Sequence, residues 1–285
     1  MREKESEGTK VRDIMVEDVA YVTVPGAREE LMEIYKERCI SGVPVVKEGK
    51  VVGVVTRQDL LRNPDERQIA LLMSREPITI SPDATIAEAA RIILARRIRR
   101  LPVVVGEKLV GIITVADIVR EIAERDYRVP VGDYIRNETI AIWDEMPLSV
   151  AGRIMELAGV KAVPVLNLEL KLVGLITDRD LINAVVIEDG TEHSDLSLGS
   201  DEDEWTWEGM RDTTRLYYTV SKIKLPNKLV RDVMVRELVT STRNCGVSEC
   251  AWKMSKNKFD QLPVVSSRDK LGGLLLDRDL LKVLI

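Results

Sequence analysis

Apolar and polar positions follow one order that recurs along the chain. In the clearest copy, a short apolar run is followed by Ser-Pro, which is typical of a helix start because Ser is a good N-cap and Pro suits the first helical position. Apolar residues then recur at helical spacing, and two further apolar runs flank a Gly-Glu turn. The pattern predicts a strand, a helix opening at Ser81-Pro82, a two-stranded hairpin and a second helix, over residues 77–80, 81–94, 101–105 with 109–114, and 116–122.

Four short strings show that this order is an internal repeat. Each string has a proline between apolar residues, at Pro44, Pro102, Pro164 or Pro263. A Gly follows each proline by 9 or 10 residues, an Asp follows each Gly by six, and a Met or Ile precedes each proline by 29. The prolines are 58, 62 and 99 residues apart, so the last interval contains an insertion. The members of each set, in chain order, are Gly53, Gly111, Gly174 and Gly273; Asp59, Asp117, Asp180 and Asp279; and Met15, Met73, Ile135 and Met234.

These units resemble CBS domains, named after cystathionine β-synthase. The matching pattern is Pro-Val-Val, a turn, and then Gly-hydrophobic-hydrophobic-Thr-x-x-Asp, and it extends over most of the chain. The whole is similar to stand-alone archaeal proteins with four CBS repeats and, in layout, to the gamma subunit of AMP-activated protein kinase. The resemblance implies an α+β fold of four β-α-β-β-α repeats, paired into two Bateman modules by sheet-to-sheet packing, with ligand clefts between the paired sheets.

The repeat boundaries divide the chain into two expected modules. Module 1 is expected over residues 8–126 and module 2 over 127–285; their repeats are expected at about 8–65 and 66–126, and at 127–187 and 227–285 on either side of an insertion at 188–226. We expect a flat monomeric disc of four units or a homodimer of such chains.

A carboxylate stands where each hairpin gives way to a helix. Three of them follow a Thr by three residues, as the pairs Thr56/Asp59, Thr114/Asp117 and Thr177/Asp180, whereas Leu276 takes the Thr position before Asp279. Such a carboxylate can accept two hydrogen bonds from the cis-diol of a ribose. In CBS proteins that bind adenosine compounds, the matching Asp holds the ribose and the matching Thr assists. The alternative is that Thr-x-x-Asp marks only a helix start.

Phosphate groups require cations, and the second repeat is the most basic. Before Pro102 the chain carries Arg96, Arg97, Arg99 and Arg100. The resemblance to the kinase gamma subunit implies phosphate contacts from Arg96 and Arg97, with single cations at equivalent places in the first and fourth repeats, Arg38 and Lys258. The alternative is that these cations are solvated and stabilised by a helix C-terminus.

Adenine would require an apolar slot. Residues that flank three of the prolines are candidates for it, namely Val43, Val45, Leu101, Val103, Val163 and Val165. The alternative for each of them is an ordinary buried strand position.

The insertion differs in composition from the repeats. Residues 188–204 contain eight acidic residues and neither Lys nor Arg, and Trp205 and Trp207 follow. This composition is typical of a mobile acidic loop with aromatic anchors that docks a protein partner, or of a solubilising linker whose Trp residues pack on the domain. His193, without Cys or His companions, is expected to have a structural or solvent role.

Composition narrows the classes of function. The net charge is −5, from 42 basic and 47 acidic residues, which disfavours a nucleic-acid-binding protein. Cys39, Cys245 and Cys250 lack a disulfide or metal spacing, so reduced thiols, no metal and a cytoplasmic location are expected. Because residues 1–10 are charged and lack an apolar stretch, we expect no signal peptide, and no apolar run in the sequence is long enough to span a bilayer.

The resulting functional expectation is a non-catalytic, energy-sensing regulator that binds AMP, ADP or ATP. The alternatives are a sensor of S-adenosylmethionine or methylthioadenosine, and a scaffold with vestigial clefts. An enzyme similar to inosine monophosphate dehydrogenase is disfavoured, because the repeats leave no room for a catalytic barrel of about 250 residues.

Overall fold

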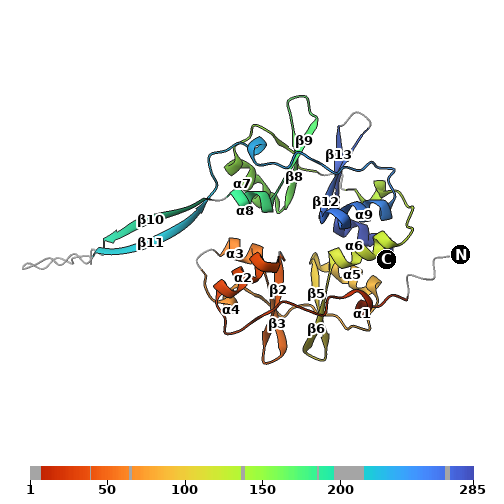
Figure 1. The fold of residues 1–285 in the computed structure, drawn as a ribbon, viewed down its shortest axis with the longest axis horizontal. Coiled ribbons are helices and arrows are strands. Elements are labelled where there is room, and N and C mark those ends of the chain that lie inside the picture. Colours follow the sequence, from red (N-terminus) through yellow and green to blue (C-terminus); the bar gives the residue numbers. More distant parts are fainter. Residues whose placement is uncertain are drawn as a thin grey trace, which may run out of the picture. The chain divides into compact units, whose positions relative to one another are not determined.

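The computed structural model describes residues 8–38, 40–63, 66–135, 139–184, 186–195, 215–266 and 270–285. They form two compact units, which are treated separately below (Figure 1). The first unit combines Met1–Glu138 with Val239–Ile285, and the second is Thr139–Leu238.

Each repeat follows the predicted order, preceded by a short helix. Repeat 1 contains α1 (Val11–Ile14), β1 (Val22–Thr23), α2 (Arg28–Arg38), β2 (Gly42–Lys47), β3 (Lys50–Thr56) and α3 (Arg57–Arg62). Repeat 2 contains α4 (Ile69–Leu72), β4 (Ser74–Arg75), α5 (Ile86–Arg96), β5 (Arg100–Val105), β6 (Lys108–Thr114) and α6 (Val115–Glu124). The α+β character predicted from the sequence is confirmed.

The other two repeats have the same plan with shorter pieces. Repeat 3 contains the 3₁₀ helix η1 (Val131–Tyr134), β7 (Ile142–Trp143), α7 (Leu148–Ala158), β8 (Ala162–Leu166), β9 (Leu172–Thr177) and α8 (Asp178–Ala184). Repeat 4 contains η2 (Val230–Asp232), α9 (Val247–Asn257), β12 (Gln261–Val265), β13 (Leu271–Leu276), α10 (Asp277–Leu280) and η3 (Leu281–Leu284). In repeats 2 and 4 the first strand shrinks to a single parallel bridge, Ile80 to Val103 and Ser241 to Val264.

The sheets are built from one antiparallel hairpin per repeat. In the first unit, β1-β2-β3-β6-β5 form a continuous sheet, and β4 pairs with β3. The hairpins of repeats 1 and 2 meet at one pair, Lys50 opposite Lys108. In the second unit, β7, β8 and β9 form a three-stranded sheet.

The segment at the start of each repeat packs on a neighbouring repeat instead of its own. Met15 of repeat 1 lies against Gly111 of repeat 2, while Met73 of repeat 2 lies against Gly53 of repeat 1. A β-bridge joins Val16 to Ile112 on one side, and β4 pairs with β3 on the other. Because a side chain on either Gly would overlap the methionine sulfur, the Met-to-Gly spacing seen in the sequence records a reciprocal exchange between paired repeats.

The second half of the chain shows the same exchange inside each unit. In the first unit, Pro130 of repeat 3 bridges Gly246 of repeat 4. In the second unit, Val235 of repeat 4 bridges Leu175 of repeat 3, and Met234 packs on Gly174. Repeats 1 and 2, and repeats 3 and 4, are therefore the exchanging pairs.

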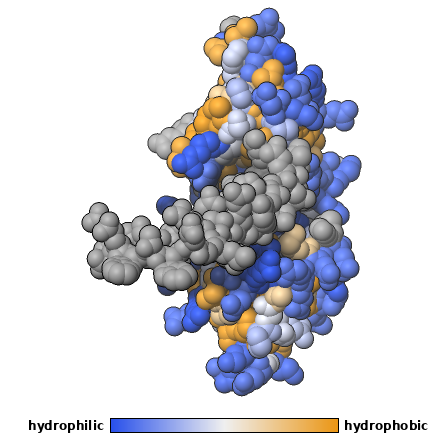
Figure 2. Space-filling view, turned by 90° about the vertical axis from the view of Figure 1, so that its left-hand side faces the viewer, coloured by the Kyte–Doolittle hydropathy of each residue, from blue (hydrophilic) through white to orange (hydrophobic). Residues whose placement is uncertain are grey.

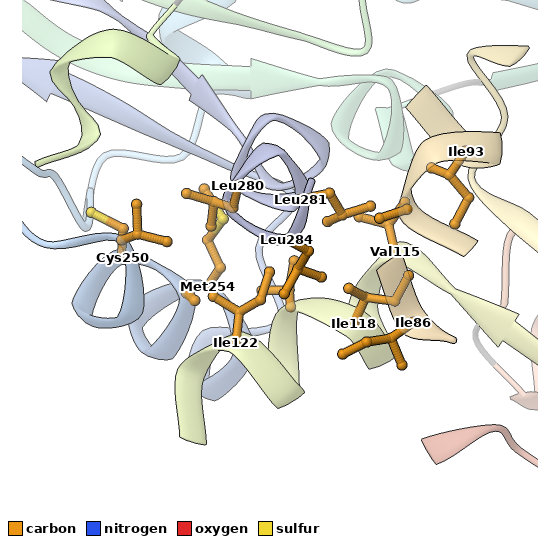
Figure 3. Packing of buried hydrophobic residues seen from close by; sticks show 14 of the residues in the cluster. Ile86, Ile93, Val115, Ile118, Ile122, Cys250, Met254, Leu280, Leu281 and Leu284 are labelled. Carbon is orange, nitrogen blue, oxygen red and sulfur yellow. The ribbon is translucent and has the colours of Figure 1, made fainter. Parts of the chain in front are cut away.

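Aliphatic side chains fill the cores, as the low aromatic content requires. In the first unit, α5, α6, α9, α10 and η3 share one core, in which Ile93, Ile118 and Met254 are almost fully buried (Figure 3). Repeat 1 has a separate core around Leu31 and Tyr35. On the face shown in Figure 2, hydrophilic surface predominates and hydrophobic residues form separate patches. Among the described residues, no helix is both long and apolar enough to cross a bilayer.

The predicted start of the helix in repeat 2 was wrong. The helix of repeat 2 begins after Thr85, not at Ser81-Pro82, because Thr85 and Glu88 form a reciprocal capping box. Ser81 instead closes a turn by accepting a hydrogen bond from the amide of Asp83.

The insertion, predicted as a loop or linker, contains a β-ribbon. Strands β10 (Val186–Asp195) and β11 (Arg215–Lys224) pair antiparallel over their full length. The register sets Glu188 opposite Lys222 and Asp195 opposite Arg215, so the acidic strand faces a basic one that sequence analysis did not consider. Trp205 and Trp207 lie outside the described residues, and their predicted role as anchors stays a prediction.

The exchange makes a stability prediction. A Cβ at Gly53 would lie 2.6 Å from Met73 Sδ and 2.9 Å from the carbonyl oxygen of Ser74, and the backbone atom cannot move cheaply. We expect Gly53→Ala to destabilise the fold by about 1–3 kcal/mol, measured by urea unfolding. Gly272→Ala is the matched control, because its Cβ would meet only Val264 O at 3.4 Å. Equal stability of the two variants would contradict the exchange as described.

Candidate functional site

The four strand-to-helix junctions share one backbone contact. In each repeat, the first amide of the helix after the hairpin donates to the carbonyl three residues before the repeat's proline. The donor–acceptor pairs are Arg57 to Ser41, Val115 to Arg99, Asp178 to Lys161 and Asp277 to Asp260, at 2.8–3.1 Å. This contact brings the residues just before the first hairpin strand next to the helix start, so side chains from both segments meet at one place.

The predicted Thr/Asp pairs form capping boxes. Thr56 donates to Asp59 Oδ2 through its amide and its hydroxyl, at 2.8 and 2.7 Å. The equivalent bonds hold Asp117 Oδ2 to Thr114 and Asp180 Oδ2 to Thr177. The helix-start alternative therefore describes these contacts correctly, but it accounts for one carboxylate oxygen only.

The second oxygen of the carboxylate differs between repeats. Asp117 Oδ1 accepts a hydrogen bond from Arg120 at 2.9 Å, and Asp279 Oδ1 lies 3.2 Å from Lys282 Nζ. Both of these carboxylates are buried. Asp59 and Asp180 are half-buried, and within the described part of the chain no hydrogen-bond or ion-pair partner reaches their Oδ1 atoms.

The repeat 4 junction is closed by an ion pair from repeat 2. Arg99 donates two hydrogen bonds to Asp277, at 3.0 and 2.6 Å, and also lies 3.2 Å from Asp260. Burial raises the pKa of Asp277, and the guanidinium of Arg99 opposes that rise. Leu276 meanwhile leaves the helix start without a hydroxyl cap. This junction is organised around an internal arginine.

The repeat 1 junction gathers cations instead. Arg100 of repeat 2 reaches across to donate to Ser41 Oγ at 2.8 Å, and a Cβ at Gly42 would overlap its guanidinium. The guanidinium of Arg57 lies 5.7 Å from the ring centroid of Tyr35 and donates to the carbonyl oxygen of that residue. Neither arginine has a carboxylate within ion-pair distance among the residues that the structure describes.

Burial and neighbouring charges shift the pKa values of Arg100 and Tyr35. Burial lowers the pKa of Arg100, and the nearby charges of Arg99 and Arg57 lower it further. Burial also raises the pKa of Tyr35 above its usual range, and the charge of Asp59 adds to the rise. A half-buried set of like charges favours an incoming anion.

The cations predicted to bind phosphate lie elsewhere. Arg96 and Arg97 are exposed at the end of α5, and Arg97 takes the left-handed conformation that ends the helix. Lys258 occupies the same position after α9, and Gly159 does so after α7. Arg38 forms an exposed pair with Asp18 at 2.8 Å. Their proposed phosphate contacts stay predictions.

All six residues proposed for an adenine slot are core residues. Val43, Val45, Leu101, Val103, Val163 and Val165 are each no more than 1% exposed. They belong to the three hydrophobic cores, which is the strand position that the sequence left open as the alternative. As placed, they expose no surface to a ligand ring.

Sequence analysis missed the roles of Arg57, Arg99, Arg100 and Asp277. Two features of the sequence could have pointed to them, namely their position in the repeat and their charge. Position three before each proline and the first helical residue are tied by the same backbone contact in every repeat, so their side chains can meet. Arg99 and Asp277 occupy these two positions in different repeats with opposite charges. Among the described residues, no group of three or more His, Cys, Asp or Glu side chains could hold a metal ion.

Comparison with known proteins identifies the class. The CBS domain family matches four segments of the chain, at residues 11–66, 67–124, 131–187 and 230–285. The chain therefore belongs to the CBS domain family, and its repeats form Bateman-type pairs.

Relatives of similar length share the whole arrangement. The chain is 27% identical over 264 residues to the uncharacterized protein MJ1225 of Methanocaldococcus jannaschii, covering 84% of this chain and 86% of that one. The solved structure of MJ1225, described as an archaeal homologue of γ-AMPK, matches 97% of this chain and 100% of its own with a TM-score of 0.74 at 22% identity. An uncharacterized conserved protein of Pyrococcus horikoshii matches with the same coverage, a TM-score of 0.69 and 28% identity.

The chain also matches part of an enzyme. The chain is 32% identical over 111 residues to inosine-5'-monophosphate dehydrogenase of Korarchaeum cryptofilum, which is 38% of this chain but 23% of the enzyme. The likeness therefore leaves most of that enzyme unmatched.

The Arg99–Asp277 pair makes a second stability prediction. We expect Arg99→Ala to cost about 3–5 kcal/mol at pH 7, because it leaves Asp277 charged and buried without its paired guanidinium. In the native chain, burial raises the folded-state pKa of Asp277 and Arg99 opposes the rise. In the variant the opposing charge is gone, so the pKa is higher still, and protonation of Asp277 relieves the cost. The loss of unfolding free energy in the variant, relative to the native chain, should therefore shrink as the pH falls. The change should occur as the pH passes through the raised folded-state pKa of Asp277 towards about 4, the pKa of an unfolded Asp.

Chemical unfolding at pH 7 and pH 4.5 measures this difference. The matched control is Arg96→Ala, an exposed arginine on α5, which should change stability by less than about 0.5 kcal/mol. A deficit for Arg99→Ala that is independent of pH would contradict the assignment to Asp277.

Proposed function

We propose that this protein is a non-catalytic regulator that binds an adenosine-containing ligand at its strand-to-helix junctions, with AMP at the junction of repeat 1. The observation that carries the proposal is a carboxylate oxygen and two guanidinium groups at one junction that have no ion-pair partner among the residues the structure describes. Asp59 supplies the oxygen, and Arg57 and Arg100 supply the cations.

The chemistry of the site suits a nucleoside monophosphate. The cis-diol of ribose donates two hydrogen bonds, and a carboxylate accepts them in a charge-assisted geometry. Asp59 is held in a fixed orientation by Thr56, so less conformational freedom is lost when the diol binds. The fork of N–H groups on each arginine matches the oxygens of a phosphate.

The same junction provides a route for regulation. A phosphate on Arg100 acts on the residue next to Arg99, whose bidentate pair with Asp277 ties repeat 2 to repeat 4. Ligand binding can shift a protein between two arrangements only by contacting them differently. Within the first unit, this buried ion pair is the contact on which a ligand at the repeat 1 junction would act.

The junction of repeat 3 favours a second ligand class. Asp180 is half-buried, and no partner reaches its Oδ1 atom among the described residues. Asp178 stands where repeat 1 has Arg57. Fewer cations suit an adenosine compound without phosphate, such as methylthioadenosine or S-adenosylmethionine. A catalytic role is not proposed, because the four family matches take up most of the chain.

Calorimetric titration with AMP and adenosine tests the proposal. Arg100→Gln should weaken AMP binding about tenfold, the value of one charge-assisted phosphate contact, and leave adenosine binding unchanged. Asp59→Asn, which keeps the shape of the side chain, should weaken both ligands. Thermal unfolding of each variant verifies that the fold is retained.

One further variant tests which arginine contacts the phosphate, Arg100 as proposed from the structure or Arg96 as proposed from the sequence. Arg96→Gln changes a cation that the sequence suggested as a phosphate contact but that lies exposed at the end of α5. A larger loss of AMP affinity in Arg96→Gln than in Arg100→Gln would move the phosphate to the helix end. Failure of the native chain to bind AMP, adenosine and methylthioadenosine would refute the proposed function.

A further inference from the structure

The residue three positions after each junction carboxylate differs between repeats in a way that none of the assigned roles explains. It lies one helical turn further along, on the face that carries the carboxylate. In repeats 2, 3 and 4 these residues are Arg120, Asn183 and Lys282. The first repeat has Arg62, whose side chain lies outside the described residues.

In repeats 2, 3 and 4, where the structure describes this side chain, the difference coincides with the state of the carboxylate. Where the third residue is Arg120 or Lys282, the Asp is buried and its Oδ1 atom is paired. Where it is Asn183, the Asp is half-buried and its Oδ1 atom has no partner among the described residues. Oδ2 is committed to the helix cap in repeats 2 and 3 alike, so Oδ1 is the oxygen that decides whether a diol can be received.

The surroundings of Asp117 allow the cation to leave. Arg120 is 53% exposed, whereas the side chain of Asp117 is 7% exposed, so the arginine covers the carboxylate from the solvent side. A cavity of about 340 Å³ lies here, lined by Asp117, Arg120 and residues that include Asp13, Met15 and Glu124. Releasing Arg120 would therefore expose the carboxylate to a space large enough for a ribose.

We propose that Arg120 acts as an internal competitor for the ribose diol, so that the junction of repeat 2 is closed to adenosine while that of repeat 3, with Asn183, is open. This inference rests on the proposed function and adds which junctions fill. A ligand at repeat 2 must displace a charge-assisted hydrogen bond before it can form its own. A ligand at repeat 3 meets no such cation on Oδ1 among the described residues.

The chain itself supplies the matched exchange. Arg120→Asn gives repeat 2 the residue of repeat 3, and Asn183→Arg does the reverse; both positions are exposed on helices, so neither change disturbs a core. Adenosine is the probe because it carries the diol without phosphate, so loss of an arginine does not remove a phosphate contact. To isolate repeat 2, Arg120→Asn is placed in a chain that also carries Asp59→Asn and Asp180→Asn.

Calorimetric titration with adenosine gives the readout. In that background, Arg120→Asn should strengthen binding about three- to tenfold, the value of a partly exposed ion pair on a buried carboxylate. Adding Asp117→Asn should abolish the gain. In the otherwise native chain, Asn183→Arg and Asp180→Asn should each weaken adenosine binding, because both affect the junction of repeat 3. Thermal unfolding checks that every variant is folded.

The outcomes separate this inference from the proposed function. If Asp59→Asn and Asp180→Asn weaken adenosine binding but Arg120→Asn leaves it unchanged or weakens it, the competitor role is overturned and the proposed function stands. If the native chain binds no adenosine compound, both are overturned. A gain from Arg120→Asn that survives Asp117→Asn also overturns the inference, because the new site would not involve the carboxylate.

Discussion

A carboxylate at a helix start has two oxygens, and here the cap takes one of them. In repeats 1, 2 and 3 the Thr amide and hydroxyl both bind Oδ2 of the Asp, which fixes the orientation of the carboxylate and leaves Oδ1 to its surroundings. Whether Oδ1 meets a cation or solvent then differs from one junction to the next. The structural and the functional interpretations of Thr-x-x-Asp are therefore compatible, because they concern different atoms.

The exchange of starting segments makes these junctions composite. Since Met15 and Met73 each pack on the Gly of the other repeat, repeats 1 and 2 cannot separate without exposing both contacts. The same pairing lets Arg100 of repeat 2 cross over Gly42 to Ser41 of repeat 1. A Cβ at position 42 would overlap the guanidinium of Arg100 where it now lies, so a side chain there would force the arginine to move.

Much of the fold was predictable because the repeat leaves a strong record in the sequence. The hairpins, the order of elements and the buried face of α5 follow from apolar spacing. The recurring Met and Gly positions mark the residues that the exchange brings together. The start of α5 was misjudged because Ser81 and Thr85 are both good caps, and only Thr85 has a Glu three residues later to complete the box. The β-ribbon was missed because its first strand is acidic and, taken alone, is typical of a loop. Its basic partner strand, β11, lies about 30 residues later in the sequence.

The positions of the junction carboxylates were predictable, and those of the neighbouring cations were less so. Spacing alone identified Asp59, Asp117 and Asp180, since a helix start recurs with the repeat. It could not distinguish the arginines that end α5 from Arg99 and Arg100, because a shift of three residues separates an exposed helix end from a strand position that faces a neighbouring repeat. Pairings such as Arg99 with Asp277 join residues 178 positions apart and depend on tertiary packing.

A crystal structure of the protein grown with AMP tests the central claim most directly. The account predicts a nucleotide at the repeat 1 junction, with its ribose hydroxyls on the carboxylate of Asp59 and its phosphate on Arg57 and Arg100. A nucleotide bound away from the strand-to-helix junctions, with Asp59 holding only its helix cap, would contradict it.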